Sequence, residues 1–516
     1  MRKILKIIIL FVLLFGVDKA FSQHDNNSLL YSNQAVLFGD QGASFDPISI
    51  IMPGTAAKSG IGSFMDNPAS MALFNKSYVD FGLSYGTVQE DAIYFSNSQI
   101  QDNNQFNLSN IGFLYTFPTE QGSFVIGAAY SRHTTFNRAL GFSARNEQST
   151  ITDQFKTDGS PYQNIAFNTF ATDYGDEFED WDESIFRIGF DDFGDFLGIR
   201  QQGEIFQDGG GGEYSLFFAT EFQKNLMVGA SIGLLSGNFE YDRIFQEVDE
   251  FNDYNSQIID SDDDGTFDTD IDNIILDDNL NTRYNGFRAR AGLLYKLTEN
   301  FNVGVSYTLP TKITIDEEFD ATVTTTFDNG NEFSDGTDSE FSYNVNYPGM
   351  LAIGAAVQDL SGLSVSFSAE YVDYSSTEIE FEESDLFEDE VIENEFIQEA
   401  FQPVWSYRAG VEYELNPALT VRGGYSFKPS RFEDGIDDRT AYSLGAGFAI
   451  GNGVRFEAAA RYLTWDEEST VYDYGEYNYE PLEENPPLPP TVSFQSETAN
   501  RTVDQWQFLG TIRVRM

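Results

Sequence analysis

From Ser77 to the end of the chain, the sequence repeats short segments in which apolar and polar residues alternate. In the last segment, Trp506, Phe508, Gly510, Ile512, Val514 and Met516 occupy every second position, and polar residues such as Gln507 and Arg513 lie between them. Residues 287–295, 419–427 and 454–462 show the same period of two. Because successive side chains of a strand point to opposite faces, each segment is expected to be a strand with one apolar and one polar face.

Very short polar turns join these segments in pairs. Six can be read from the sequence, at Pro118–Gln121, Gln223–Lys224, Thr298–Asn300, Asp359–Gly362, Asn416–Pro417 and Gly451–Asn452. The connections between the pairs look longer and mostly acidic. The sequence predicts fourteen strands. Each of the six turns joins two strands, and a first strand over 77–88 and a last strand over 501–515 complete the number.

An even strand number, with short turns at one end and long loops at the other, is typical of outer-membrane barrels. The alternative is a soluble antiparallel sheet with one solvated face, which has no reason to keep this two-sided asymmetry. We therefore predict an all-β fold, a fourteen-stranded antiparallel transmembrane β-barrel over residues 77–516 with long acidic extracellular loops.

The N-terminus has the pattern of an export signal. A basic stretch, Met1–Lys6, precedes a mostly apolar run, Ile7–Val17, and the small-residue site Ala20–Ser22. The apolar run is too short to span a membrane as a helix. We expect residues 1–22 to be a signal peptide and the mature protein to reach the outer membrane of a Gram-negative bacterium.

The composition restricts the functions that the chain can have. Its 29 Lys and Arg residues against 83 Asp and Glu residues give a net charge of −54, which disfavours binding to nucleic acid. The chain has no cysteine and two histidines, His24 and His133, so a triad, a Cys/His pair or a histidine-based zinc site has little support. We expect no catalytic residues and no enzymatic activity.

Residues 23–76, which precede the first predicted strand, are expected to form a hatch, or plug, inside the barrel. Within them, Gly54–Phe74 contains small residues, an Asn67-Pro68 turn and apolar side chains, the composition of a compact enclosed coil. We expect this turn to fix the segment inside the barrel, where its apolar side chains would make the contacts.

The polar faces of the predicted strands carry cations in an otherwise acidic chain. These candidate lumen cations are Arg288, Arg290, Lys312, Arg408, Arg422, Arg455, Arg461 and Arg513. One interpretation is that they pair with lumen acids such as Glu370, Glu412 and Glu457 and hold the interior together. In the other, a subset binds the carboxylate of a ligand.

Two acidic segments between the predicted strands could have specific structures, a calcium-binding loop and an amphipathic helix. Asp260, Asp262, Asp264 and Asp268 have the spacing of a calcium loop, with Gly265 at the turn, but Ile271 stands where a bidentate acid is expected. A structural calcium in an extracellular loop and a merely solvated loop both fit; no other cofactor is expected. In the long connection Glu147–Gly212, residues 178–188 are expected to form an amphipathic helix, and Gly209–Gly212 to precede a strand.

The chain resembles the FadL/TodX family of outer-membrane transporters of hydrophobic compounds. Gly54–Gly60 and the Asn-Pro-Ala segment 66–73 are similar to the family's plug, although the family's Met-Gly-Gly core is reduced here to Ser59–Gly62. The recurrent turn-strand phrases of the family are matched at Leu226–Gly233, Asn302–Pro310, Tyr347–Gly354 and Pro417–Phe427.

The resemblance implies a fourteen-stranded barrel closed by a hatch. It also implies a pocket for hydrophobic ligands beside the hatch, which would be lined from the hatch side by Phe64, Met65, Met71, Leu73 and Phe74. It also implies passive transport of hydrophobic molecules such as long-chain fatty acids, released sideways or to the periplasm. A second hypothesis is a scaffold or cargo shuttle of an outer-membrane secretion or assembly system, with a protein partner at the extracellular loops.

Overall fold

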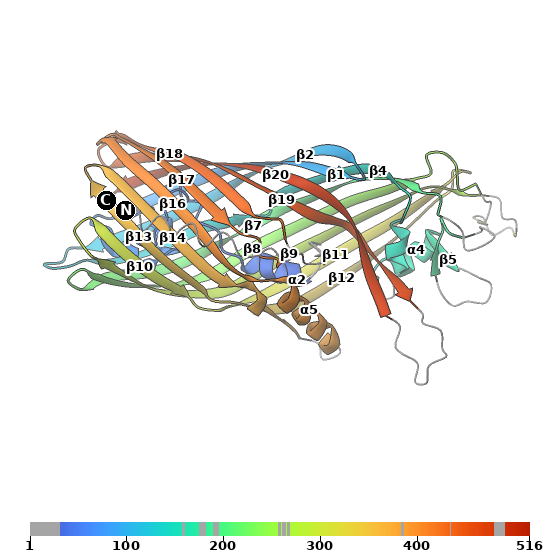
Figure 1. Ribbon diagram of the computed structural model, residues 1–516, viewed down its shortest axis with the longest axis horizontal. Helices are drawn as coiled ribbons and strands as arrows, with labels where there is room; N and C mark the ends of the chain where they lie inside the picture. Colours follow the sequence, from blue (N-terminus) through green and yellow to red (C-terminus); the bar gives the residue numbers. More distant parts are fainter. Residues whose placement is uncertain are drawn as a thin grey trace, which may run out of the picture.

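The protein is a closed antiparallel β-barrel with its N-terminal segment inside (Figure 1). The computed structural model describes residues 31–156, 160–174, 182–188, 196–255, 260, 265, 269–382, 386–433, 435–478 and 491–516. The predicted signal peptide lies outside these residues.

Eighteen strand segments form the fourteen strands of the wall, because four wall strands are each interrupted once. The uninterrupted strands are β1 (Tyr78–Tyr94), β2 (Asn97–Phe117), β7 (Ile199–Gln223), β8 (Leu226–Val248), β9 (Ile271–Lys296), β16 (Pro403–Asn416), β17 (Leu419–Lys428), β18 (Arg439–Gly451), β19 (Val454–Asn478) and β20 (Thr491–Arg515). The interrupted ones are β3 (Phe124–Thr135) with β4 (Arg138–Asn146), β10 (Phe301–Thr308) with β11 (Thr311–Phe327), β12 (Glu332–Tyr347) with β13 (Met350–Leu360), and β14 (Leu363–Asp373) with β15 (Glu378–Phe381). Pairing of β1 with β20 closes the barrel, with Tyr78 opposite Arg515. The prediction of a fourteen-stranded barrel is confirmed.

The helices are short and do not belong to the wall. They are α2 (Tyr31–Gly39), η2 (Ile61–Phe64), η3 (Pro68–Leu73), α3 (Thr152–Phe155), α4 (Gln163–Asn168), η4 (Tyr374–Ser376) and α5 (Phe387–Ala400). Figure 1 shows α2 within the barrel and α4 beside a small separate sheet formed by β5 (Thr172–Tyr174) and β6 (Asp182–Ser184). Within the described residues, no helix is both long and apolar enough to cross a membrane.

All six predicted turns join strands at one end of the barrel, the end where β1 begins and β20 ends. The prediction that every other connection is long is wrong. The two residues Phe95 and Ser96 join β1 to β2, and Asp328–Asn331 join β11 to β12. The strands use residues assigned to loops because they continue well past a membrane, so β1 ends at Tyr94 rather than near 88 and β20 begins at Thr491 rather than near 501.

The long connection after β4 also differs from the prediction. Strand β7 begins at Ile199, so Gly209–Gly212 lie within a strand instead of preceding one. The predicted helix over 178–188 is wrong for its described part, since 182–184 form β6 and pair with 172–174 of β5. The Ile185 N–H then donates to the Ala171 carbonyl (3.1 Å), so the backbone here is committed to the β5–β6 hairpin.

The wall changes polarity along its length, as strand β8 shows. Toward the short turns, Ile232 projects outward and is 50% exposed. Toward the other end, Asp242 projects outward, whereas Phe239 and Phe245 project inward and are fully buried. We call the part of the wall with outward apolar side chains the membrane half, and the part beyond it the outer half.

The membrane half carries a band of aromatic side chains at its border with the outer half. Pairs of rings from neighbouring strands lie 4.8 to 5.6 Å apart, at Tyr130 and Tyr214, Tyr371 and Trp405, Tyr425 and Tyr442, and Tyr462 and Trp506. Such girdles mark the membrane surface in outer-membrane barrels, because Tyr and Trp place an apolar ring and a polar group at the interface.

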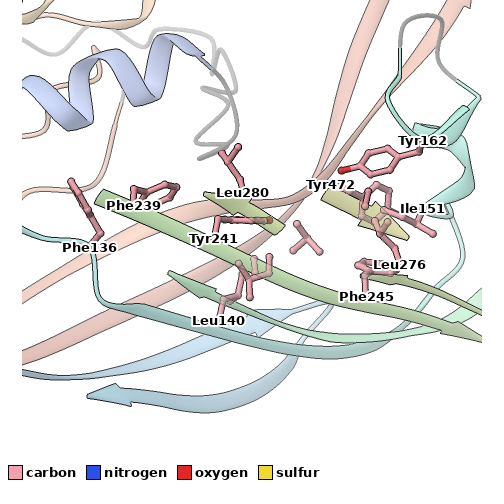
Figure 2. Close-up of a cluster of buried hydrophobic side chains, with 14 of the residues drawn as sticks. Phe136, Leu140, Ile151, Tyr162, Phe239, Tyr241, Phe245, Leu276, Leu280 and Tyr472 are labelled. Atoms are coloured by element: carbon pink, nitrogen blue, oxygen red, sulfur yellow. The ribbon is translucent and has the colours of Figure 1, made fainter. Parts of the chain in front are cut away.

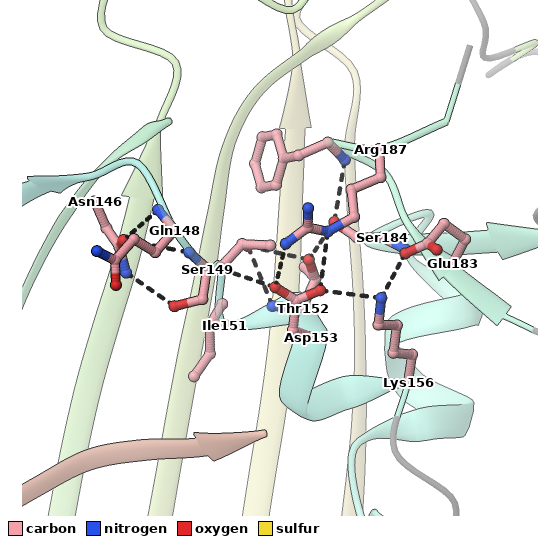
Figure 3. Close-up of polar contacts among 12 residues, drawn as sticks. Asn146, Gln148, Ser149, Ile151, Thr152, Asp153, Lys156, Glu183, Ser184 and Arg187 are labelled. Carbon is pink, nitrogen blue, oxygen red and sulfur yellow. Dashed lines mark hydrogen bonds and ion pairs between the residues drawn. The ribbon is translucent and has the colours of Figure 1, made fainter. Parts of the chain in front are cut away.

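The outer half is filled by its own side chains and by the cap, our name for residues 147–156, 160–174 and 182–188. Figure 2 shows Ile151 and Tyr162 of the cap beside Phe245, Leu276 and Tyr472 of the wall. Polar contacts stiffen the cap itself (Figure 3): Arg187 pairs with Asp153 (2.8 Å), and Lys156 with Glu183 (2.7 Å). Apolar burial thus closes the outer end of the barrel.

Candidate functional site

The described N-terminal segment, residues 31–77, is the hatch, and it touches the inner wall on many sides. It lies against a belt of inward-facing glycines, at Gly112, Gly229, Gly292, Gly304, Gly354, Gly410, Gly424 and Gly445. A Cβ atom at Gly292 would lie 1.9 Å from Asn67 Oδ1, and one at Gly304 would lie 2.0 Å from the Thr55 carbonyl oxygen. The hatch backbone fits because the wall has no side chains at these positions.

The predicted hatch turn is the part most closely docked on this belt. The Asn67 side-chain amide donates to the carbonyls of Thr55 (2.7 Å) and of Leu293 in β9 (3.1 Å). Its oxygen accepts from Ala69 N–H (2.9 Å), which caps η3, and Pro68 is the first residue of that helix. One side chain therefore both shapes the turn and ties it to the wall.

The five apolar hatch residues lie together, and none of them lines the cavity described below. Phe64, Met65, Met71 and Phe74 are fully buried, with Leu73 packed against them. The cluster also contains Ile61, Ala69 and Ala72 of the hatch, and Leu114, Val125, Phe217, Ala219, Met227 and Leu294 of the wall. The Phe64 and Phe217 rings stack at 5.0 Å. Wall side chains surround these residues, so they anchor the hatch in this structure, and their role in a ligand pocket stays a prediction.

Most of the lumen arginines are paired in the membrane half. Arg290 contacts Glu213 (2.7 Å), Arg422 contacts Glu412 (2.6 Å) and Glu457 (2.7 Å), Arg455 contacts Glu457 (3.0 Å), Arg513 contacts Asp80 (2.5 Å), and Arg408 contacts Asp66 (2.8 Å) and Glu370 (3.5 Å). These pairs are the interior cross-links that the first of the two interpretations expects.

Lys312 is the exception, because it is not in the lumen. Its side chain is 57% exposed and pairs with Glu380 on the outer surface (Nζ to Oε2, 2.7 Å). Thr308 of β10 and Thr311 of β11 both face inward, so the interruption at Leu309 and Pro310 reverses the alternation. A single such reversal moves every following side chain to the other face.

A cavity of about 100 Å³ lies between hatch residues 40–43 and the wall. Its apolar lining comes from Ala43, Pro348, Met350, Val372 and Phe427, with the rings of Tyr347, Tyr374 and Tyr407. Its charged lining consists of four cations, Arg288, Arg408, Lys428 and Arg461, and two carboxylates, Asp40 and Glu370. The cavity is therefore cationic in a chain whose net charge is −54.

Two polar groups at this cavity lack strong partners. In the described part of the chain, the Arg461 guanidinium has one hydrogen bond, a long one to Ser426 Oγ (3.5 Å). The Tyr347 hydroxyl is buried and has no hydrogen-bond partner among the described residues. Arg288, by contrast, donates to the Gly39 carbonyl (3.1 Å) and to Gln41 (3.2 Å) of the hatch. Unused donors beside an apolar surface suit a ligand with a polar head and an apolar tail.

Comparison with known proteins identifies the family to which this barrel belongs. The family model of the outer membrane protein transport proteins (OMPP1/FadL/TodX) matches residues 222–484, just over half of the chain. The chain belongs to this family. It is accordingly an outer-membrane barrel of the OMPP1/FadL/TodX type, whose members transport hydrophobic small molecules.

Solved structures of the OMPP1/FadL/TodX type resemble this chain over nearly its whole length. The Pseudomonas putida toluene transporter TodX is 12% identical, with a TM-score of 0.49 over 93% of this chain and 99% of TodX. The Ralstonia pickettii toluene transporter TbuX is 16% identical (TM-score 0.46, 92% and 99%), and a Pseudomonas aeruginosa FadL homologue is 11% identical (TM-score 0.48, 92% and 98%). A search of curated proteins finds no match.

The sequence indicated only part of the cavity of this OMPP1/FadL/TodX protein. Arg288, Arg408 and Arg461 stood out as cations on polar strand faces, but Asp40, Tyr347 and Lys428 did not. Lys428 follows directly on the alternating segment 419–427, at the next polar-face position, which is the one signal that could have found it.

The predicted calcium loop lies mostly outside the described residues. Asp260 is described, and its carboxylate accepts a hydrogen bond from Gly265 N–H (2.7 Å), whereas Asp262, Asp264 and Asp268 are not. Among the residues that the structure describes, no group of three or more His, Cys, Asp or Glu side chains is placed to hold a metal ion. Calcium binding at this loop stays a prediction.

Proposed function

We propose that this barrel carries molecules with a long alkyl chain and an anionic head group, such as long-chain fatty acids, across the outer membrane by passive diffusion. The observation that supports the proposal is the cationic cavity beside hatch residues 40–43, where Arg461 has no carboxylate partner among the described residues. A carboxylate head group would supply that partner.

The apolar part of the cavity supports binding of the alkyl chain. Each CH₂ group that leaves water contributes about 0.8 kcal/mol, so a few methylenes against Met350, Val372 and Phe427 already give useful affinity. A hydrogen-bonded contact with a cation adds about 1.5 to 3 kcal/mol. The cation therefore serves selectivity more than affinity.

The charged lining also bears on the choice between ligand classes. TodX and TbuX are described as toluene transporters, and CymD as a monoaromatic hydrocarbon channel. A hydrocarbon has no group that could satisfy an arginine or the Tyr347 hydroxyl, so a site for hydrocarbons alone would leave these donors unpaired. We infer that anionic amphiphiles suit this cavity better than uncharged aromatics.

Binding of palmitic acid and hexadecanol to the barrel in mild detergent tests the proposal. We expect palmitate to bind more tightly, and Arg461→Gln to weaken palmitate about tenfold without changing hexadecanol. Arg455→Gln is the matched control, because Arg455 is a lumen cation that does not line the cavity. Equal affinities for acid and alcohol, or no binding of either, would refute the proposal.

A scaffold or cargo-shuttle role is the second candidate. It is favoured by the acidic outward surface of the outer half, where Glu240, Asp242 and Glu318 face solvent. A protein partner with a basic surface would fit there. Affinity purification from intact outer membranes separates the two functions, since a stoichiometric protein partner supports the scaffold and an isolated barrel with bound lipid supports transport.

A further inference from the structure

We propose that Asp40 of the hatch is a tethered competitor for the head group of the ligand, and that an incoming carboxylate displaces it and frees hatch residues 40–43. This inference rests on the proposed function, since it assigns a consequence to anion binding in the same cavity. It makes the hatch respond to the charge of the ligand and not only to its apolar tail.

Three carboxylates of the hatch pair with cations of the wall, and two of them also belong to the internal structure of the hatch. Asp46 accepts from the N–H groups of Ile48 (2.9 Å) and Ser49 (3.0 Å), and it lies 3.7 Å from Arg513. Asp66 accepts from Gly54 N–H (2.7 Å) while it contacts Arg408. Loss of either wall contact would leave these carboxylates bound within the hatch.

Asp40 is different because the partners of its carboxylate all lie outside the hatch. It contacts the Lys428 ammonium group, and it accepts from the Tyr374 hydroxyl (3.0 Å). Lys428 also lies over the Tyr374 ring, 5.4 Å from its centroid. All three residues line the cavity. The Asp40 side chain thus occupies the kind of anion site that the head group of a fatty acid would use.

The backbone around Asp40 is held by few other contacts. Residues 40–43 have no regular secondary structure, and Gly42 is exposed. The remaining ties are the Asp40 N–H to the Val36 carbonyl (3.2 Å) and Gln41, which accepts from Arg288 and Arg290 (2.8 Å). A segment with few bonds opens at low free-energy cost, so loss of the Asp40 contacts is enough to loosen it.

Exchange of one carboxylate for another keeps the buried cation paired throughout. A ligand carboxylate that binds Arg461 first is already in the cavity with Ser426, two residues before Lys428 on β17. From there it can replace Asp40 at Lys428 and Tyr374, so Lys428 keeps an anion beside it while the Asp40 carboxylate is released with residues 40–43. A neutral ligand of equal length cannot make this exchange, because it would leave Lys428 without an anion.

Hydrogen exchange of a peptide covering residues 36–45, measured on the full barrel in detergent, tests the inference. We expect saturating palmitate to speed exchange several-fold, and saturating hexadecanol to leave it unchanged. Asp40→Asn should exchange fast without ligand, show no further response, and bind palmitate about tenfold more tightly because the competitor is gone. Glu380→Gln, which breaks an acid–lysine pair outside the cavity, is the matched control and should behave as the unmodified protein.

The outcomes separate the inference from the proposed function. If palmitate binds but exchange over 36–45 does not rise, or hexadecanol raises it equally, the competitor role is overturned while transport of acids stands. If palmitate binds neither the unmodified protein nor Asp40→Asn, both are overturned. Slower exchange with palmitate would also overturn the inference, because it would mean that the ligand clamps the hatch.

Discussion

The membrane half and the outer half of the barrel are built from the same strands and have opposite polarity. In strand β9, Phe287 and Leu293 face outward and Arg288 and Arg290 inward in the membrane half, whereas Leu276 and Leu280 face inward in the outer half. The strand alternates throughout, and only the side that carries the apolar residues changes. The change follows from the surroundings of the two halves. The outer face of the membrane half lies in lipid, where apolar side chains are favourable, and the outer face of the outer half lies in water, where polar side chains are favourable.

The two halves therefore hold their contents by different forces. In the outer half, the cap and α2 are packed among apolar side chains, and their stability follows from the apolar area removed from water. In the membrane half, the rest of the hatch has an apolar cluster of its own, and it is held in addition by close backbone contact with glycines, by hydrogen bonds and by ion pairs. Polar substitutions should therefore be poorly tolerated inside the outer half. Substitutions that enlarge a side chain should be poorly tolerated where the hatch contacts the glycines of the membrane half.

The largest effect is expected from truncation of a side chain inside the outer half. Phe245 is fully buried against Phe142 and Tyr472, so Phe245→Ala should destabilise the cap by about 3 to 5 kcal/mol. The measurement is hydrogen exchange of the cap in detergent. Phe218→Ala, in the outward band of the membrane half, is the control and should leave the cap unchanged. Equal effects of the two changes would contradict the difference between the halves.

The next effect compares one substitution at two outward positions of the same strand. Ile232→Arg places a charge against lipid and should cost about 2 to 4 kcal/mol, whereas Ile244→Arg in the outer half should cost almost nothing. The two isoleucines are similarly exposed, at 50% and 55%. Reversible folding into lipid vesicles measures both. A cost at Ile244 as large as that at Ile232 would place the membrane border further out than the aromatic girdle.

A smaller effect is expected from the hatch turn. Replacement of both Asn67 and Pro68 by Gly removes the hydrogen bonds to the Thr55 and Leu293 carbonyls and should loosen the hatch by about 1 to 3 kcal/mol. Leakage of small solutes from liposomes with the inserted barrel should rise. The same double change at Asn416 and Pro417, an exposed turn between β16 and β17, serves as the control. Unchanged permeability would show that this turn does not seal the barrel.

The smallest effect is a dependence of the cap on pH. Burial raises the pKa of the Glu247 carboxyl from 4.5 to about 7, against the effect of the hydrogen bond from the Thr150 hydroxyl. The Ile151 N–H (2.9 Å) and the Gln201 side chain (2.8 Å) also donate to it, and Asp153 is the nearby carboxylate that raises the pKa. The closed cap thus binds a proton more tightly than an open cap would.

This stabilisation is complete below pH 4.5 and is lost as the pH rises through about 7. After correction for intrinsic rates, residues 148–155 should exchange more slowly at pH 5 than at pH 8. Glu247→Gln should remove the difference, and Glu250→Gln, at an exposed position, should preserve it. A pH dependence that persists in Glu247→Gln would assign it to another group.

The sequence predicted the wall well because alternation and turn residues are local signals. The six turns and the outward positions of Trp506 and Phe508 followed from them directly. The reversal that turns Lys312 outward was missed, because a two-residue interruption leaves the alternation of each flanking strand intact. The length of β1 was missed because strands outside the membrane have polar outward faces and resemble loops.

The candidate site was predicted less well than the wall. Its cavity combines Asp40 of the hatch with Tyr347, Lys428 and Arg461, residues more than three hundred positions away along the chain. A pattern within a short stretch of sequence cannot indicate that residues so far apart along the chain lie close together in the fold. The apolar residues of 64–74 did predict contact with the barrel, but a sequence cannot tell whether apolar side chains face a ligand or fill the space themselves.

The glycine belt has a consequence for how the molecule is assembled. Its members come from β2 near one end of the wall sequence and from β16, β17 and β18 near the other, and the same short stretch of hatch rests on all of them. The last contacts, of Ile51 with Gly410, Gly424 and Gly445, can form only when the late strands arrive. The hatch therefore ties the early and the late strands of the wall together, because one short segment contacts both.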